Sequence, residues 1–140
     1  MKSKAPLALM EQILMVLVFA LAAALCLQIF VFGSQVSRRS EARDSAMLVV
    51  QNAAEVLKVN RGNMQLCARL LGGENNADVW QIGYDADWQE TNSDAAEYLV
   101  RAVPVATNDP LLGCADVFAQ TVDGDSLFQV RVAWQEVGDE

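Results

Sequence analysis

The chain has 140 residues, 53% of them hydrophobic, and a formal net charge of −8 at pH 7. Residues 45–140 hold 15 acidic and 5 basic side chains, so the distal part is strongly acidic and is expected to repel nucleic acid. Histidine is absent, which removes the commonest general base and the commonest metal ligand.

The sequence begins with a short basic segment, residues 1–6, and an apolar run follows shortly after it. Residues 13–32 read ILMVLVFALAAALCLQIFVF, in which Gln28 is the only polar side chain apart from the thiol of Cys26. A helix of this length rises about 30 Å, the thickness of the hydrocarbon core of a bilayer. A cleaved signal peptide has a shorter apolar core, of about 7–15 residues, and ends at a small-x-small site. The run therefore predicts a membrane anchor.

The charges that flank the run do not decide its orientation. Lys2 and Lys4 lie on one side and Arg38, Arg39 and Arg43 on the other, so the positive-inside rule is nearly balanced. We expect a single-pass membrane protein with a cytoplasmic N-terminus, because an acidic, cysteine-bearing domain suits an extracytoplasmic compartment.

A second helical pattern follows the apolar run, over residues 35–59. Its small and apolar side chains recur at helical spacing and form one stripe of Ala42, Ala46, Val49, Ala53 and Leu57, which is widened by Val50, Ala54 and Val56. No proline falls between Leu7 and Val103, so nothing covalent interrupts the helix. The two patterns together predict one continuous helix from at least Leu9 to Val56.

The distal part begins with turn and cap signals. Asn60-Arg61-Gly62-Asn63 is expected to end the long helix. Residues 64–71 predict a short helix that Gly72-Gly73 closes, and residues 75–78 are expected to form a loop.

Beyond residue 79 the apolar side chains alternate with polar ones, as they do in strands. Strands are predicted over residues 80–84, 98–106, 115–121 and 126–136, with a polar connection at 85–96. Pro104 has no N–H to donate, so the second strand is predicted to lie at a sheet edge or to contain a bulge. Asp123-Gly124 predicts a β-hairpin between the last two strands.

One face of the last predicted strand is apolar and needs a partner. Phe128, Val130, Val132 and Trp134 share this face, and the helix stripe is the only large apolar stripe available to cover it. These elements predict an α+β fold in which a long N-terminal helix packs on a small antiparallel β-sheet. The predicted segments are a leader (1–6), a transmembrane segment (7–33), an amphipathic continuation of the helix (34–60) and an exported α/β domain (61–140).

The residues Leu7-Ala8-Leu9-Met10-Glu11, which join the basic leader to the apolar run, resemble the start of a type IV pilin or pseudopilin. In that family a prepilin peptidase cuts before the first of these residues, and the glutamate pairs with the new amine of a neighbouring subunit. The resemblance implies Leu7 as the mature N-terminus and Glu11 as the pairing acid. It implies a structural subunit of a type IV filament or of a type II secretion or competence pseudopilus. The implied partners are other pilin-like subunits and a membrane assembly platform.

Pro6 departs from this pattern, because the family has a glycine before the cut. Proline fixes its own φ angle and restricts the residue before it, so cleavage between Pro6 and Leu7 stays open. The alternative is a permanently anchored, single-pass protein whose exported domain binds another envelope protein and is neither processed nor polymerised.

The remaining expectations concern the cysteines, the tryptophans and the possibility of catalysis. Cys67 and Cys114 lie outside the apolar run, and such a pair in an exported domain predicts a disulfide, with two buried thiols as the alternative. The tryptophans are assigned either to the core or to a binding groove. No serine has a histidine to activate it, and no cysteine spacing fits zinc. We therefore expect no enzyme, no cofactor and no metal site.

Overall fold

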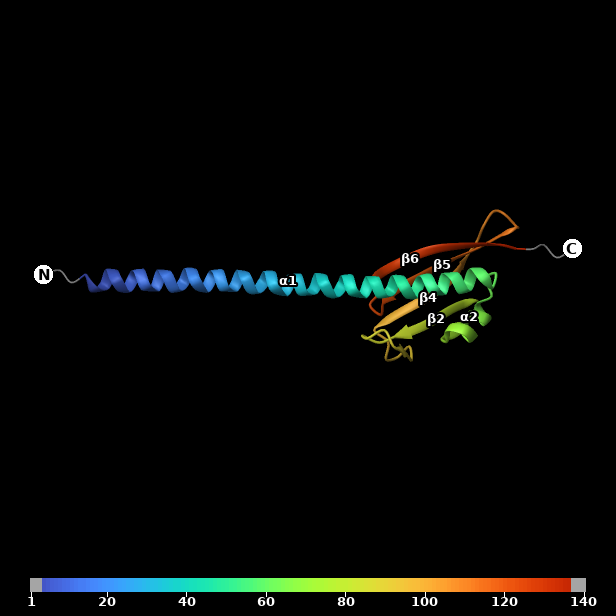
Figure 1. The fold of residues 1–140 in the computed structure, drawn as a ribbon, viewed down its shortest axis with the longest axis horizontal. Coiled ribbons are helices and arrows are strands. Elements are labelled where there is room, and N and C mark those ends of the chain that lie inside the picture. Colours follow the sequence, from blue (N-terminus) through green and yellow to red (C-terminus); the bar gives the residue numbers. More distant parts are fainter. Residues whose placement is uncertain (1–3, 137–140) are drawn as a thin grey trace. The chain divides into compact units, whose positions relative to one another are not determined.

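The computed structural model describes residues 4–136, which form two helices and six strands. Helix α1 runs without interruption from Ala5 to Val59, which confirms the predicted continuous helix, and α2 covers Met64–Leu71. The strands are β1 (Glu74–Asn76), β2 (Val79–Tyr84), β3 (Glu90–Thr91), β4 (Tyr98–Val105), β5 (Leu112–Thr121) and β6 (Ser126–Gln135) (Figure 1). The chain separates into two compact units, residues 1–40 and 41–140, and α1 contributes to both.

The two ends of α1 follow from its sequence. Pro6 lies in the first turn of the helix, where its missing N–H would have no partner within the helix in any case. At the other end, Arg61 and Gly62 take positive φ angles of 50° and 75°, and the N–H of Gly62 donates to the carbonyl of Leu57 at 2.9 Å. This is the left-handed cap that glycine permits at the end of a helix.

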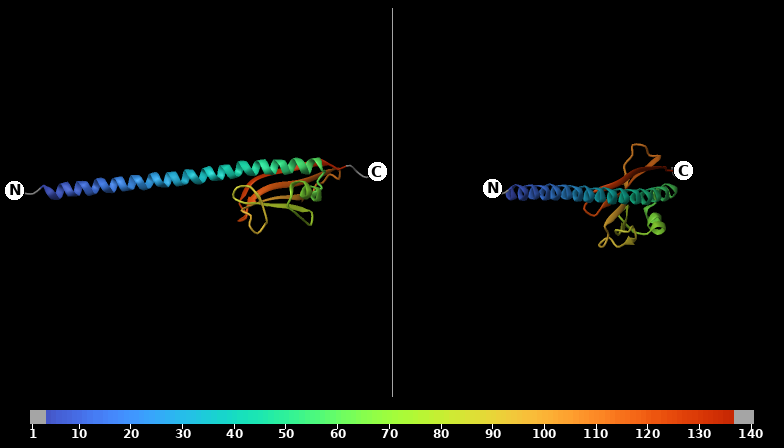
Figure 2. Two further views of the ribbon diagram at one scale, coloured as in Figure 1. Left: turned by 60° about the horizontal axis from the view of Figure 1, so that its bottom comes forward. Right: turned by 60° about the vertical axis from the view of Figure 1, so that its left-hand side comes forward.

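The strands of the second unit form one antiparallel sheet in the order β1-β2-β4-β5-β6, and β3 pairs with β2. The longest pairings join β4 to β5 and β5 to β6. In both views of Figure 2 the sheet runs along the part of α1 that belongs to this unit. The result is an α+β fold with a long helix on one face of a small antiparallel sheet, as predicted.

The core of the second unit lies between this sheet face and α1. The helix contributes Ala46, Val50, Ala53 and Leu57, which are at most 3% exposed. The sheet contributes Trp80, Ile82, Val100, Ala102, Ala115, Val117, Ala119 and Val132. Val50, which the prediction placed at the margin of the stripe, is fully buried, whereas Val49 is half-buried. The spacing of four, three and four residues keeps the buried positions on a single face of the helix.

Two short strands contradict the predicted loops. Residues 74–76 form β1 and pair with β2 across a turn in which Ala77 and Asp78 have φ angles of 48° and 66°. Such a turn usually contains glycine, and its absence here concealed the hairpin. The predicted connection at 85–96 contains β3, whose two residues pair with the end of β2.

The prediction that Pro104 lies in an edge strand or at a bulge is also wrong. β4 lies inside the sheet, between β2 and β5, and its pairing with β5 is regular through Pro104. However, β2 pairs only with residues 98–102. Pro104 lies beyond the end of β2, so β5 is its only neighbouring strand.

Candidate assembly surface and pockets

In the first unit, α1 presents an apolar surface. Every residue from 4 to 33 is exposed, and Phe19 and Phe30 reach 76% and 75% exposure. α1 is the one helix in the described part of the chain that is long and apolar enough to cross a membrane. A continuous apolar surface of this extent is not left facing water in soluble proteins. It fits lipid or the apolar surfaces of other helices.

Glu11 is the acidic side chain nearest to this surface. It lies on α1 two residues before Ile13, where the apolar run begins, and it is exposed. Within residues 4–136 it forms no ion pair. Its carboxylate is therefore available to a positive charge from outside the described chain.

Helical geometry places Ala20 and Ala24 on the side of α1 opposite Glu11, whereas Ala22 lies on the same side as Glu11. Ala20, Ala24 and Gln28 follow one another at intervals of four residues and share one side of the helix. Glu11 precedes Ala20 by nine residues, or about two and a half turns. Small side chains allow helices to approach closely in a membrane, and an amide can form hydrogen bonds between them. The helix therefore carries two candidate contact surfaces, one that contains Glu11 and Ala22 and one that contains Ala20 and Ala24.

The resemblance also singled out Pro6 and Leu7 as the residues on either side of a processing site. Both lie in α1, which begins at Ala5, so the bond between them belongs to the first helical turn. Leu7 is 70% exposed.

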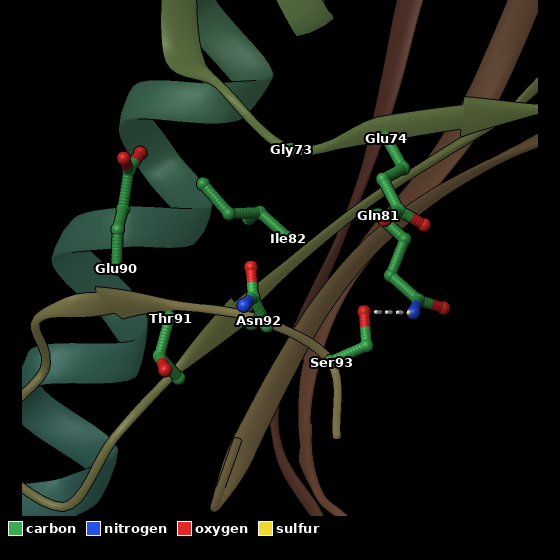
Figure 3. Close-up of a pocket in the computed structure, with 9 residues that line it drawn as sticks. Gly73, Glu74, Gln81, Ile82, Glu90, Thr91, Asn92 and Ser93 are labelled. Carbon is green, nitrogen blue, oxygen red and sulfur yellow. Dashed lines mark hydrogen bonds between the residues drawn. The ribbon is translucent and has the colours of Figure 1, made fainter. Parts of the chain in front are cut away.

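A polar pocket of about 380 Å³ lies in the second unit beside β2 and β3. It is lined by Gly73, Glu74, Gln81, Ile82, Gly83, Glu90, Thr91, Asn92 and Ser93. The side-chain amide of Gln81 donates to the hydroxyl of Ser93 at 3.4 Å, and Glu74 and Glu90 lie on opposite sides of the pocket (Figure 3). The described residues contain no group of three or more potential metal ligands. The separated carboxylates do not converge on a point where one ion would sit.

The three tryptophans have different surroundings. Trp80 is 1% exposed, and its indole N–H donates to the carbonyl of Gly72 at 2.8 Å. Trp88 stacks on Tyr98 with ring centroids 4.5 Å apart. It lies in a loop where Asp85 accepts two hydrogen bonds from backbone N–H groups. Trp80 is thus a core residue, and Trp88 covers one end of the core.

Trp134 lies half-buried on the core face of β6 and packs against two glycines. A Cβ atom on Gly62 or on Gly113 would collide with its indole ring, so both positions require glycine. Trp134 also lines a second pocket, of about 360 Å³, with Asn75, Met64 and Pro104 among its neighbours. The indole N–H of Trp134 and the side-chain oxygen of Asn75 are buried without a hydrogen-bond partner in the described residues.

The predicted disulfide between Cys67 and Cys114 is absent, because both thiols are free. Cys67 lies in α2, is 1% exposed and belongs to the core. Cys114 lies on β5, where its neighbour Ala115 points into the core. Side chains alternate along a strand, so Cys114 lies on the opposite face of the sheet. A bridge would have to pass through the sheet, and the sequence alone could not reveal this.

The outer face of the sheet carries one ion pair. Arg131 on β6 contacts both carboxylate oxygens of Asp116 on β5, at 2.7 and 2.9 Å. The hydrogen bonds from Arg131 hold the pKa of Asp116 below its usual value. Sequence reasoning missed this pair, as it missed the pocket beside β2, because both depend on the register between strands.

Comparison with known proteins adds no relative. No protein-family model matches the chain, and no curated protein or solved structure is significantly similar to it.

Proposed function

We propose that the protein is a pilin-like structural subunit, of the minor pilin or pseudopilin kind, that assembles through α1 in a membrane. The observation that carries this proposal is that one uninterrupted helix has two parts with different surroundings. Residues 4–33 expose apolar side chains on all sides, whereas Ala46, Val50, Ala53 and Leu57 are buried under the sheet. One half of the helix is thus left for contacts with other molecules, and the other half carries the folded unit.

The two candidate surfaces of α1 suit an open assembly. Glu11 lies on one side of the helix, and Ala20 and Ala24 lie on the opposite side. A subunit that uses different surfaces toward its two neighbours makes head-to-tail contacts, which extend into a filament unless the rotation closes a ring. This geometry supports a filament or pseudopilus subunit rather than a symmetric dimer.

Glu11 would contribute to the register of the assembly. A carboxylate at the edge of the hydrocarbon is tolerated while water reaches it. Once neighbouring helices surround it, the desolvation of its charge has to be offset by a positive charge. The N-terminal amine of a neighbouring subunit would supply that charge after cleavage between Pro6 and Leu7.

The same proposal assigns the location and the partners. The N-terminus lies in the cytoplasm, α1 crosses the membrane once, and the unit of residues 41–140 lies outside the cytoplasm. The partners are other pilin-like subunits and a membrane assembly platform. The role is structural, without catalysis and without a cofactor.

One observation favours the alternative, a permanently anchored module that binds another envelope protein. Pro6 replaces the glycine of the pilin pattern, and α1 begins before the bond that would be cut. In this alternative the leader remains attached, and the apolar part of α1 serves only as an anchor.

Mass spectrometry of the mature N-terminus, combined with crosslinking in membranes, separates the two functions. The pilin-like function predicts a chain that begins at Leu7 and a ladder of crosslinked species larger than a dimer. An intact chain that begins at Met1 and stays monomeric after crosslinking would contradict it and support the anchored module.

A further inference from the structure

Two arginines, Arg38 and Arg39, follow the apolar run of α1. Both are exposed, and within residues 4–136 neither guanidinium group forms an ion pair. Residues 1–40 contain a single acid, Glu11, which lies 27 residues before Arg38, or about 40 Å along the helix. Glu41, three residues beyond Arg38, forms no ion pair with it. The two positive charges are therefore available to an anion from outside the chain.

The position of these arginines matches the phosphate layer of a bilayer. Arg38 follows Phe32, the last residue of the apolar run, by six residues, or about 9 Å along the helix. The headgroup region adds about 5–8 Å to each side of the hydrocarbon core. Side chains of a helix tilt toward its N-terminus, so both arginine side chains extend back toward the end of the run. Their guanidinium groups thus reach the level of the lipid phosphates when the run crosses a membrane.

A shallow groove lies on α1 directly before the two arginines. Its volume is about 370 Å³, and it is lined by Leu27, Gln28, Val31, Phe32 and Gln35. An α-helix turns by about 100° per residue, which places Arg38 and Arg39 above the groove, one on each side of its middle line. The three apolar side chains of the lining suit an acyl chain. The amide of Gln35, which lies between them and the arginines, can donate hydrogen bonds to ester oxygens.

We propose that this part of α1 is a binding site for one anionic phospholipid. An acyl chain lies along the groove, the side-chain amide of Gln35 donates to an ester oxygen, and the phosphate pairs with Arg38 and Arg39. Arginine suits this role because its planar guanidinium group forms two parallel hydrogen bonds with phosphate. A headgroup that carries an amine would bring a further positive charge beside the arginines, so a headgroup without an amine is favoured. The inference rests on α1 crossing a membrane, which the pilin-like subunit and the anchored module have in common, and not on assembly.

A second copy of the chain is a poorer occupant of this site. A membrane holds the apolar runs of neighbouring chains at similar depth, which brings their arginine pairs side by side, and like charges repel. Residues 12–40 contain no acid that could offset this repulsion. A lipid phosphate brings the opposite charge to the same level.

The test uses the full-length protein, extracted in a mild detergent from vesicles of equal parts phosphatidylglycerol and phosphatidylcholine. Native mass spectrometry counts the lipids of each kind that stay on a single chain. Arg38→Gln combined with Arg39→Gln removes both charges of the site. Arg61→Gln combined with Arg69→Gln makes the same change of charge at exposed positions beyond α1 and serves as the matched control. The wild type and the control should retain phosphatidylglycerol at least about tenfold over phosphatidylcholine, whereas the variant of the site should prefer it less than about twofold.

Two further measurements locate the lipid and identify its source. A benzophenone side chain in place of Gln35 should capture a phospholipid on irradiation. Inorganic phosphate should displace no more phosphatidylglycerol than sodium chloride of equal ionic strength does, because the groove holds the acyl chain as well as the phosphate.

Four results would overturn the proposal. They are equal retention of both lipids by the wild type, a preference in the variant of the site as strong as in the control, release of the lipid by inorganic phosphate alone, and capture of a second chain in place of lipid at position 35. The last of these would favour a protein neighbour. Lipid retention is measured on single chains and assembly on crosslinked ones, so either proposal can fail without the other.

Discussion

At the scale of single residues, the position of each cysteine relative to the sheet determines the reactivity of its thiol. Cys67 is enclosed in the core, and burial raises the pKa of its thiol. Cys114 lies on the opposite face of the sheet and is partly exposed. A thiol reacts as its thiolate, so the two residues should differ in reactivity as well as in position.

Alkylation should reveal three free thiols in the protein. Without any reductant, the denatured chain should take up three alkyl groups, on Cys26, Cys67 and Cys114. In the folded protein Cys114 should react at least about tenfold faster than Cys67, because a buried neutral thiol is unreactive. Counting the groups by mass spectrometry checks this, and uptake of a single group by the unreduced chain would restore the predicted disulfide.

At the scale of elements, α1 and the sheet stabilise each other in residues 41–140. Leu57 is 1% exposed and lies among the core side chains, whereas Leu48 on the same helix is 66% exposed. The two leucines have equal helix propensity and differ only in burial. They therefore form a matched pair for measuring how much this packing contributes.

Leu57→Ala should lower the free energy of unfolding by about 2–5 kcal/mol, the usual cost of removing a buried leucine side chain. Leu48→Ala should change it by less than about 0.5 kcal/mol, as is usual for exposed positions. Denaturant unfolding, followed by the fluorescence of the tryptophans that lie in or against the core, measures both. Equal losses in the two variants would mean that α1 does not pack on the sheet in this way.

Periodicity was sufficient to predict most of these elements. The stripe from Ala42 to Leu57 predicted the helix and its buried face to within one position, and Asp123-Gly124 predicted the last hairpin. Sequence failed where pairing rather than composition decides structure. Ala77-Asp78 makes a tight turn without glycine, and Pro104 fits inside the sheet because β2 ends before it.

At the scale of the whole molecule, the candidate sites also differ in whether the sequence alone reveals them. The apolar run and Glu11 could be read directly, because a membrane anchor and a charge beside it are properties of contiguous sequence. The polar pocket beside β2 and the ion pair between Arg131 and Asp116 could not. They depend on which strands are neighbours and on the register between them, which are properties of long-range contacts. The proposed pilin-like function therefore rests on local features of the sequence.

The central claim is that α1 assembles with other subunits and that the charge of Glu11 contributes. Glu11→Gln keeps the size of the side chain and removes its charge, while Glu41→Gln makes the same change further along α1, beyond the apolar run. Both variants should reach the membrane and keep the folded unit intact. A neutral amide cannot offset a neighbouring amine, so Glu11→Gln alone should lose most of the crosslinked species.

Crosslinking of membrane fractions from cells that express the wild type, Glu11→Gln or Glu41→Gln is the most direct test. The account predicts ladders of equal intensity for the wild type and Glu41→Gln, and a ladder reduced about tenfold or more for Glu11→Gln, which corresponds to about 1.4 kcal/mol of lost interaction. Equal ladders in all three proteins would contradict the role of Glu11, and the absence of any ladder in the wild type would contradict assembly itself.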